Sequence, residues 1–277
     1  DASTGGYFHL ENAFVSTSPC KESRVQFGQF KLPFMAEASA DDRFQMGASR
    51  GVISSLFGQG YSQGIQVQYN KDRVQLFGAF SDGFNTDNSF FTDSRESSYS
   101  FTGRANYLIT GDRKALDQFS SELGSTQSVM AGVAAHFQDG AYENVFSYTA
   151  DVNWQNDGKS FFAAFVGRHE FDGSDNYTDF GVEFQGAYRC SSNNEIFARW
   201  ETFFADDSRG WDVNRFNFAT VGYNHYFAGQ NARFTLQGVY SFNPTSNMMD
   251  CGFGDTGLLG SSGAGEAALV AQFQFAF

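Results

Sequence analysis

The stretch DFGVEFQGAYR, from Asp179 to Arg189, alternates large apolar residues with polar or charged ones. Read with a period of two, its apolar face carries Phe180, Val182, Phe184 and Tyr188, and its polar face carries Asp179, Glu183, Gln185 and Arg189. Because successive side chains of a β-strand point to opposite faces, the pattern predicts a strand with one apolar and one polar face. Its length matches the about 9 to 11 residues with which a tilted strand crosses a bilayer.

The same alternation recurs along the chain, for example in 98–108, 144–154 and 233–242. It predicts 13 strands, at residues 7–17, 24–34, 62–70, 73–83, 97–110, 126–138, 142–156, 159–171, 176–189, 194–204, 214–227, 232–243 and 265–277. No linker divides the chain. The predicted fold class is therefore all-β, a transmembrane antiparallel β-barrel that forms one domain over residues 1–277.

A soluble β-sandwich is the alternative, since its strands alternate as well. Three features argue against it. The runs exceed the usual strand length of about 5 or 6 residues, and aromatic residues gather toward the ends of the apolar faces, as in interfacial girdles. The chain also ends in AQFQFAF, where Phe273, Phe275 and Phe277 share one face. In water such an edge would invite aggregation, so we expect lipid to cover these rings while Gln272 and Gln274 face inward.

Composition supports this reading. The chain holds 34 Phe and 12 Tyr among 277 residues, a bias toward strands. Its longest apolar run, FFAAFVG at 161–167, is far shorter than the about 18 to 20 residues of a membrane-spanning helix, so no such helix is expected. The start shows no signal peptide, so we expect that an export signal has been removed. The net charge of -13 disfavours nucleic acid as a partner.

Cys20, Cys190 and Cys251 are an odd set without CxxC or Cys/His spacing, which predicts no metal site. One disulfide with a free thiol and no disulfide at all are both compatible with them. No cofactor motif occurs. His9, His136, His169 and His225 are scattered singly. His136 faces inward and could pair with a Ser on a neighbouring strand, as in outer-membrane lipases, but no nucleophile or orienting acid accompanies it, so we expect no enzyme.

Connections between the predicted strands alternate in length. Tight turns are expected near 70–72, 156–158, 190–194 and 228–232, and long loops at 35–61, 84–96, 205–213 and 244–264. This asymmetry is typical of barrels with short periplasmic turns and long extracellular loops. Residues 111–125 fall on the short side and predict a periplasmic insertion. Because antiparallel rings of bacterial single-chain barrels have even strand numbers, either one strand is miscounted or further strands precede Asp1.

Several segments resemble the phosphate-selective porin family of Gram-negative outer membranes. They are RVQFGQFKLPFMAE at 24–37, the Arg50-Gly51 pair, QGIQVQ at 63–68, VGYNHYFAGQNARFTLQGVYSF at 221–242 and the closing AQFQFAF. The resemblance implies a barrel of about 16 strands in a homotrimer, with roughly three strands before Tyr7 and one long loop folded into a water-filled pore. It also implies lipid, lipopolysaccharide and the barrel-assembly machinery as partners, the last reading the terminal aromatic strand.

By phase, the inward polar faces carry both signs of charge. The inward cations are Arg73, Arg104, Arg168, Arg189, Arg199, Arg215 and Arg233, and the inward acids are Glu170, Asp179, Glu183, Glu195, Glu201 and Glu266. Basic side chains in a pore favour anions through charge-assisted hydrogen bonds. The predicted anion-lining residues are Lys31, Arg43, Arg50, Arg73, Arg104, Arg168 and Arg199.

The resemblance places the constriction on the loop 35–61, with Lys31 at its base and Arg43 and Arg50 on it. An ion pair with the adjacent Asp41 or Asp42 is the alternative role for Arg43, whereas Arg50 has no adjacent acid. Glu201 is the expected neutralising partner of Arg199. The predicted function is passive diffusion of small hydrophilic solutes with a weak preference for phosphate-like anions. A plugged structural barrel within a larger envelope assembly is the alternative.

Overall fold

The computed structural model describes residues 10–89, 97–140, 144–172, 175–251, 256–260 and 263–276. Within them, thirteen strands form one antiparallel sheet in which each strand pairs with its neighbours in sequence. The strands are β1 (Ala13–Cys20), β2 (Ser23–Lys31), β3 (Tyr61–Lys71), β4 (Val74–Ser81), β5 (Ser97–Thr110), β6 (Ser128–Gly140), β7 (Asn144–Asn156), β8 (Lys159–Asp172), β9 (Asp175–Ser191), β10 (Asn194–Phe204), β11 (Arg215–Tyr226), β12 (Ala232–Ser241) and β13 (Glu266–Phe275). The all-β class and the strand count are confirmed.

Most strand bounds agree with the prediction, and β5 and β10 agree to the residue. The first hairpin differs. β1 ends at Cys20, opposite Ser23 of β2, so the hairpin turns later than residue 17. β2 ends at Lys31 rather than at residue 34, because the chain then turns inward and buries Leu32 and Phe34.

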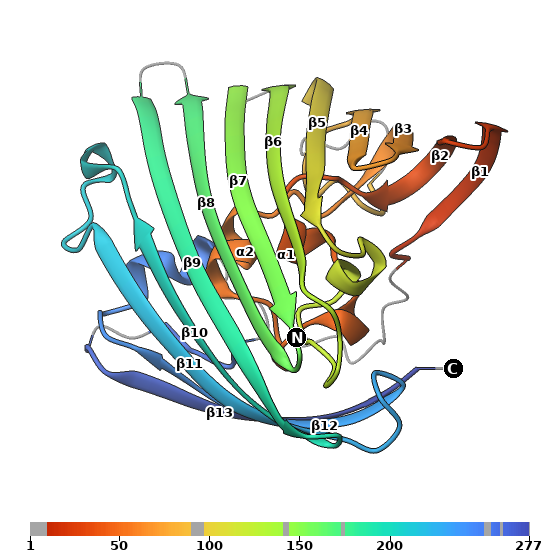
Figure 1. Cartoon of the computed structure of the whole chain (residues 1–277). Helices are drawn as coiled ribbons and strands as arrows, with labels where there is room; N and C mark the ends of the chain where they lie inside the picture. Colours follow the sequence, from red (N-terminus) through yellow and green to blue (C-terminus); the bar gives the residue numbers. More distant parts are fainter. Residues whose placement is uncertain are drawn as a thin grey trace.

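The sheet is strongly curved, and in Figure 1 it wraps around the connection between β2 and β3. That connection, residues 32–60, holds α1 (Ala36–Ser39), the short 3-10 turn η1 (Asp42–Phe44) and α2 (Val52–Phe57). We call it the inner loop. The remaining 3-10 turns are η2 (Lys114–Asp117), η3 (Asp207–Arg209) and η4 (Ser246–Cys251). In the described sheet, β1 pairs with β2 and β13 pairs with β12, and these two outer strands do not pair with each other.

The two ends of the sheet differ, as predicted. One end, which we call the turn side, carries the tight connections 21–22, 72–73, 157–158 and 192–193, and the opposite end carries 82–96, 205–214 and 242–265. The inner loop starts from this second end, the loop side. The insertion between β5 and β6 belongs to the turn side.

Alternation of faces is confirmed along the strands. On the outer face Phe101 is 53% exposed and Phe184 is 47% exposed, whereas their inward neighbours Thr102 and Glu183 are buried. Exposed Phe, Tyr, Val, Ile and Leu side chains continue around the outside from β1 to β13. An apolar outer band of this kind is what lipid covers in transmembrane barrels.

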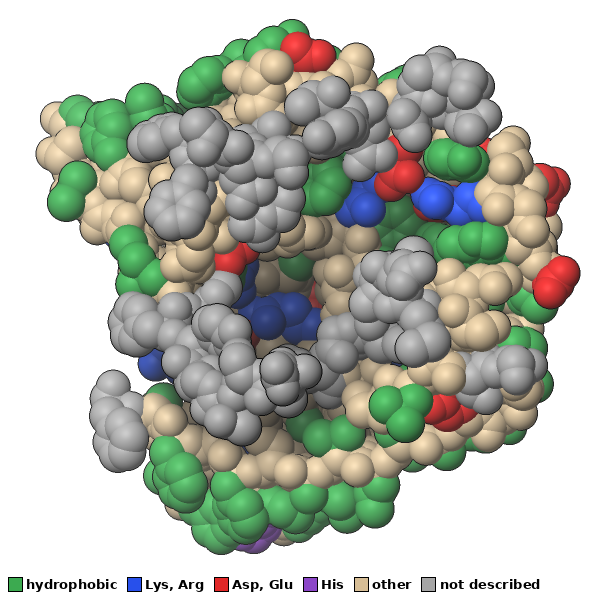
Figure 2. Space-filling model, turned by 180° about the vertical axis from the view of Figure 1, so that it is seen from behind, with side chains coloured by type: hydrophobic (Ala, Val, Ile, Leu, Met, Phe, Trp, Pro, Cys, Tyr) green, Lys and Arg blue, Asp and Glu red, His purple; other side chains and the backbone are tan. Residues whose placement is uncertain are grey.

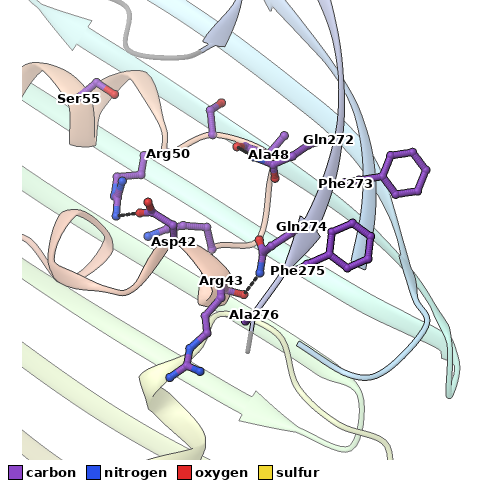
Figure 3. A pocket seen from close by; sticks show the side chains of 12 residues that line it. Asp42, Arg43, Ala48, Arg50, Ser55, Gln272, Phe273, Gln274, Phe275 and Ala276 are labelled. Carbon is purple, nitrogen blue, oxygen red and sulfur yellow. Dashed lines mark hydrogen bonds and ion pairs between the residues drawn. The ribbon is translucent and has the colours of Figure 1, made fainter. Parts of the chain in front are cut away.

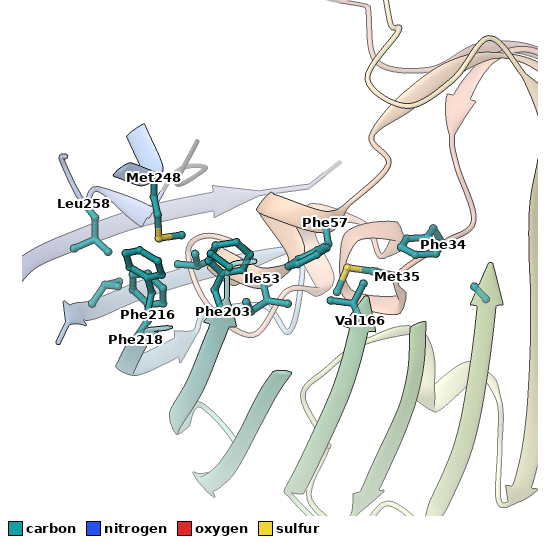
Figure 4. Packing of buried hydrophobic residues seen from close by; sticks show 14 residues of the cluster. Phe34, Met35, Ile53, Phe57, Val166, Phe203, Phe216, Phe218, Met248 and Leu258 are labelled. Atoms are coloured by element: carbon teal, nitrogen blue, oxygen red, sulfur yellow. The ribbon is translucent and has the colours of Figure 1, made fainter. Parts of the chain in front are cut away.

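An apolar core fills the interior near the loop side (Figure 4). It joins side chains of the inner loop to strands β6 to β12 and to the η4 region. Its larger members are Phe34, Met35, Ile53, Phe57, Val166, Phe203, Phe216, Phe218, Met248 and Leu258. Phe216 and Phe218 therefore face inward and Arg215 faces outward, which corrects the phase predicted for β11. The assumption that apolar strand residues face lipid fails in β11, because the interior beside this strand is packed protein rather than water.

No helix of the described chain has the length and apolar character to cross a membrane. Cys20 and Cys190 are exposed free thiols, and the side chain of Cys251 lies outside the described residues. Among the described residues, no three His, Cys, Asp or Glu side chains are arranged to hold a metal ion.

The outward rings of the last strand give a first testable prediction. Phe273 is 64% exposed on the outer face, and its ring centroid lies 4.7 Å from that of Phe234. In a bilayer, Phe273→Ser should lower the free energy of unfolding by about 2 kcal/mol, because it removes an aromatic side chain from lipid. Urea unfolding of the barrel in lipid vesicles measures this, with Ala271→Ser on the same face as the control. An unchanged midpoint would place this face away from lipid.

Phe277 and His9 lie outside the described residues.

Candidate functional site

The inner loop lies inside the curved sheet because one of its faces is apolar. Ile53 and Phe57 of α2 are fully buried against inward residues of the strand wall, and the rings of Phe57 and Phe203 meet edge to face at 5.8 Å. Burying such side chains provides the main driving force that holds the loop against the wall. The opposite face of the loop is polar and lines open space.

Inward amide and guanidinium groups from three adjacent strands hold the irregular part of the loop. Nε2 of Gln272 donates to the Ala48 carbonyl and Nε2 of Gln274 to the Arg43 carbonyl, both at 3.2 Å. Oε1 of Gln237 accepts from the Ala48 N–H at 2.9 Å. Figure 3 shows Gln272 and Gln274 directed at the loop while Phe273 and Phe275 point away, which confirms the phase predicted for this strand.

Asn224 and Arg233 extend the same arrangement toward the turn side. Nδ2 of Asn224 donates to the Met46 carbonyl at 2.9 Å, and Arg233 donates to the Gln45 carbonyl at 2.7 Å. A loop buried without such partners would leave its backbone groups unsatisfied, which is costly. These wall side chains therefore satisfy backbone groups of loop residues 43–48.

A buried charged cluster lies beneath the loop. Arg199 donates to Glu37 of α1 at 2.7 Å, and its Nε lies 3.6 Å from Glu183. Glu183 stands directly opposite Glu201 in the β9–β10 register, and Glu201 accepts the Ile53 N–H at 2.9 Å. Three carboxylates thus surround one guanidinium, and all four side chains are buried. Arg199 anchors the loop, and its main partner is Glu37 rather than the predicted Glu201.

Gly51 is required by this cluster. A Cβ atom at Gly51 would lie 2.4 Å from Oε1 of Glu201, and the Gly51 N–H donates to Glu37 at 3.2 Å. A side chain at this position would therefore displace either the Glu201 carboxyl group or the loop. The Arg50-Gly51 pair that carried part of the family resemblance therefore has a local packing reason.

Arg104 is a second buried anchor. Its two Nη atoms form a bidentate ion pair with the carboxylate of Asp151, and each N–O distance is 2.8 Å. Arg104 also donates to the Phe34 carbonyl at 2.7 Å. Two-point pairs of this kind are geometrically specific. Its charge is thus matched by Asp151 at the point where the loop leaves β2.

Arg43 and Arg50 lie on the open face of the loop. Arg43 lies 3.7 Å from Asp41, as the alternative reading of this residue expected. Arg50 pairs with Asp42 and donates to the Ala40 carbonyl at 2.9 Å, so the expectation that it lacks an acidic partner is wrong. The two residues line a cavity of about 480 Å³ between the loop and β13 (Figure 3).

Lys31 borders a neighbouring cavity of about 200 Å³ together with Arg50, Asp42 and Glu11. Its Nζ lies 5.1 Å from the centroid of the Tyr61 ring, and the Tyr61 hydroxyl donates to Glu11 at 3.1 Å. Within the described residues Lys31 forms no ion pair. Figure 2 shows Lys and Arg side chains at the bottom of a hollow in the face seen from behind, with acidic side chains beside them.

Two predicted lining residues lie elsewhere. Arg73 occupies the exposed turn between β3 and β4 and donates to the Ile109 carbonyl at 3.3 Å. Arg168 faces inward, with its guanidinium 5.2 Å from the Phe57 ring and 3.7 Å from Glu170. The structure thus brings Lys31, Arg43 and Arg50 together at the open face, and distributes Arg73, Arg104, Arg168 and Arg199 over a turn and the wall.

His136 stands opposite Ser147 in the β6–β7 register, but its hydrogen bonds go to other side chains. Its Nδ1 lies 2.8 Å from Oγ1 of Thr102, and its Nε2 lies 3.4 Å from Oε1 of Gln138. The ring is fully buried, between Phe34 and Phe84.

Sequence reasoning missed Glu37, Glu11 and the amides that hold the loop. Glu37 carried a signal, since it is the one acid in the stretch 24–37. Gln237 carried none, because inward polar residues of a barrel strand look alike whether they contact water or a loop.

Comparisons with known proteins bear on the fold. No protein-family model matches the chain, and no curated protein matches it in sequence. The anion-selective porin from Comamonas acidovorans has a similar structure, with a TM-score of 0.58 and 10% identity over 95% of this chain and 72% of that one.

Two further structures are similar. OprB of Pseudomonas putida matches with a TM-score of 0.58 and 11% identity over 85% of this chain and 68% of that chain. OmpT of Vibrio cholerae, described as expressed in the outer membrane, matches with a TM-score of 0.56 and 10% identity over 83% and 70% of the two chains. At these identities the likeness shows the fold, which is that of bacterial outer-membrane β-barrel proteins.

Proposed function

We propose that this chain, which has the fold of a bacterial outer-membrane β-barrel, is a porin that lets small hydrophilic solutes diffuse passively across the outer membrane. One observation carries the proposal. The inner loop lies within the curve of the sheet, and its open face borders two cavities, one lined by Arg43 and Arg50 and the other by Lys31 and Arg50. A long loop that narrows a polar lumen is an arrangement that sorts solutes by size and charge.

The charges at the open face support a weak preference for phosphate-like anions. Arg43 and Arg50 each have an acidic partner in Asp41 or Asp42, so both pairs are nearly neutral to a passing ion. Lys31 has no ion-pair partner among the described residues. An anion can therefore approach Lys31 without competing with an existing carboxylate. Tight phosphate selection is not proposed, since no dense cluster of unpaired lysines lines these cavities.

Ion selectivity tests the proposal. In a planar bilayer under a KCl gradient, we expect the purified protein to conduct with a weakly anion-selective reversal potential. Arg50→Ala leaves Asp42 unpaired and should lower the anion-to-cation permeability ratio about twofold, whereas Asp42→Asn leaves Arg50 unpaired and should raise it by a similar factor. The matched control is Arg73→Ala in the exposed turn. Shifts of the same sign in both loop variants would exclude this face as the selectivity filter.

The rival function, a plugged structural barrel within a larger envelope assembly, is favoured by one observation. The inner loop fills the interior beside β6 to β12 with packed side chains rather than open space. Absence of conductance in correctly folded protein would support this alternative. The homotrimer, the contact with lipopolysaccharide and the recognition of Phe273, Phe275 and Phe277 by the barrel-assembly machinery stay predictions.

A further inference from the structure

The insertion between β5 and β6, residues 111–127, folds into the interior. Leu116, Phe119, Ser120 and Ser121 are buried, although the insertion starts from the turn side, opposite to the inner loop. Asn153 of the wall donates to the Leu116 carbonyl at 3.3 Å. We call residues 111–127 the turn-side insertion.

The turn-side insertion touches the inner loop directly. The Phe119 N–H donates to the Phe44 carbonyl at 3.2 Å. The Phe119 ring packs against Phe162, with centroids 4.9 Å apart. The same buried cluster contains Met46 of the loop and Phe197 of the wall. Two connections that enter from opposite ends of the sheet therefore share one apolar cluster.

A polar network makes the same link. Ser120 donates to Oε1 of Glu195 at 3.0 Å, and Tyr226 donates to Ser120 at 3.1 Å. Asn224 donates to the same Glu195 oxygen at 2.9 Å and also holds the Met46 carbonyl of the loop. The contact between the two connections is thus both apolar and hydrogen-bonded.

The insertion itself is firmly held. The Gly158 N–H, in the turn between β7 and β8, donates to the Glu122 carbonyl at 2.9 Å, and Asp157 of the same turn accepts the Gly124 N–H at 2.7 Å. An element fixed to the sheet in this way can support a loop that by itself would fluctuate.

From these contacts we propose that the turn-side insertion positions the constriction. Phe119 is the positioning residue: its ring and its backbone bond hold loop residues 44–46, and with them the neighbouring Arg43, at the edge of the larger cavity. The inference rests on the proposed channel function. A loop that is supported from below presents a fixed aperture, whereas an unsupported loop alternates between open and obstructing positions.

Single-channel recordings test the role of Phe119. Phe119→Ala should raise the frequency of transient closures about tenfold, because it removes the ring that the loop packs on. Phe119→Leu keeps an apolar side chain and should restore much of the steady current. The matched control is Leu123→Ala, since Leu123 belongs to the same insertion but is 48% exposed. Heat-modifiable migration on gels verifies that each variant folds.

A cross-link gives a second readout. With Cys20, Cys190 and Cys251 changed to Ser, the pair Phe44→Cys and Phe119→Cys should form a disulfide, because the two backbones are hydrogen-bonded neighbours. The oxidised channel should show fewer closures than the reduced one. The control pair Phe44→Cys and Leu123→Cys should stay reduced.

Each outcome is decisive. If wild type conducts and Phe119→Ala has the same closure frequency, the positioning role is wrong and the porin function stands. If neither wild type nor Phe119→Ala conducts, the porin function fails, and the positioning role fails with it even when the cross-link forms. Conductance in Phe119→Ala alone would overturn both the porin function of the wild type and the proposed positioning role, because the insertion would then hold the loop closed.

Discussion

An Arg199→Met variant should assemble as a barrel whose inner loop no longer docks. The substitution removes the guanidinium and leaves Glu37, Glu183 and Glu201 buried beside one another without a cation. Glu183 and Glu201 are direct neighbours across β9 and β10. Removing one partner of a buried ion pair costs about 3 to 5 kcal/mol, because the remaining charge keeps its desolvation penalty. We expect the free energy of unfolding to fall by this amount.

Denaturant unfolding in vesicles, combined with limited proteolysis of residues 35–57, measures the effect. Arg24→Met is the matched control, since Arg24 is exposed on the surface, where it donates to Ser16 at 3.2 Å and lies 5.5 Å from the centroid of the Phe14 ring. The double variant Arg199→Met with Glu37→Leu should recover part of the stability, because it removes a carboxylate together with the guanidinium. A protected loop in the single variant would contradict the anchoring role of Arg199.

The second large effect concerns Gly222. It stands opposite Phe197 in the β10–β11 register, and a Cβ atom there would lie 2.2 Å from the Phe197 ring. The same ring also approaches Gly47 of the inner loop, where a Cβ would lie 3.5 Å from it. Gly222→Val should therefore push the ring into the loop and lower the free energy of unfolding by about 1 to 3 kcal/mol, with altered conductance.

Two variants check this explanation. Gly238→Val, in the next strand, should be nearly neutral because a Cβ there meets nothing within 4 Å. Adding Phe197→Ala to Gly222→Val should relieve the clash and restore a steady current, although the cavity it leaves keeps stability below that of the wild type. If Gly222→Val alone behaves like the wild type, the ring does not couple this wall position to the loop.

Strand positions could be predicted because lipid and interior impose opposite preferences on successive residues. Phe184 and Glu183 show this in β9, and the bounds of β5 and β10 agree to the residue. Phe216 and Phe218 could not be assigned in the same way. They face a packed core supplied by the inner loop and η4, so apolar character there does not mean contact with lipid.

Charge partners were the least predictable part of the site. Arg50 finds Asp42 through a bend in the loop, eight residues away in sequence, and Arg199 finds Glu37 across 162 positions. Proximity in sequence indicated Asp41 or Asp42 as the partner of Arg43 and no partner for Arg50. Which cations remain without an acidic partner depends on the path of the loop. Lys31 could therefore not be distinguished from the other predicted anion-lining residues by sequence.

The amides of β11 to β13 affect which substitutions the inner loop can accept without moving. Four uncharged amides bond the backbone of the inner loop: Asn224, Gln237, Gln272 and Gln274. Because they carry no charge, salt does not screen these hydrogen bonds. Asp42, Arg43 and Arg50 line the larger cavity, and they carry the charges there. Along β11 to β13 the loop is thus placed largely by uncharged amides, and substitutions at Asp41, Asp42 or Arg43 can change the electric field at its open face while these amide contacts are kept.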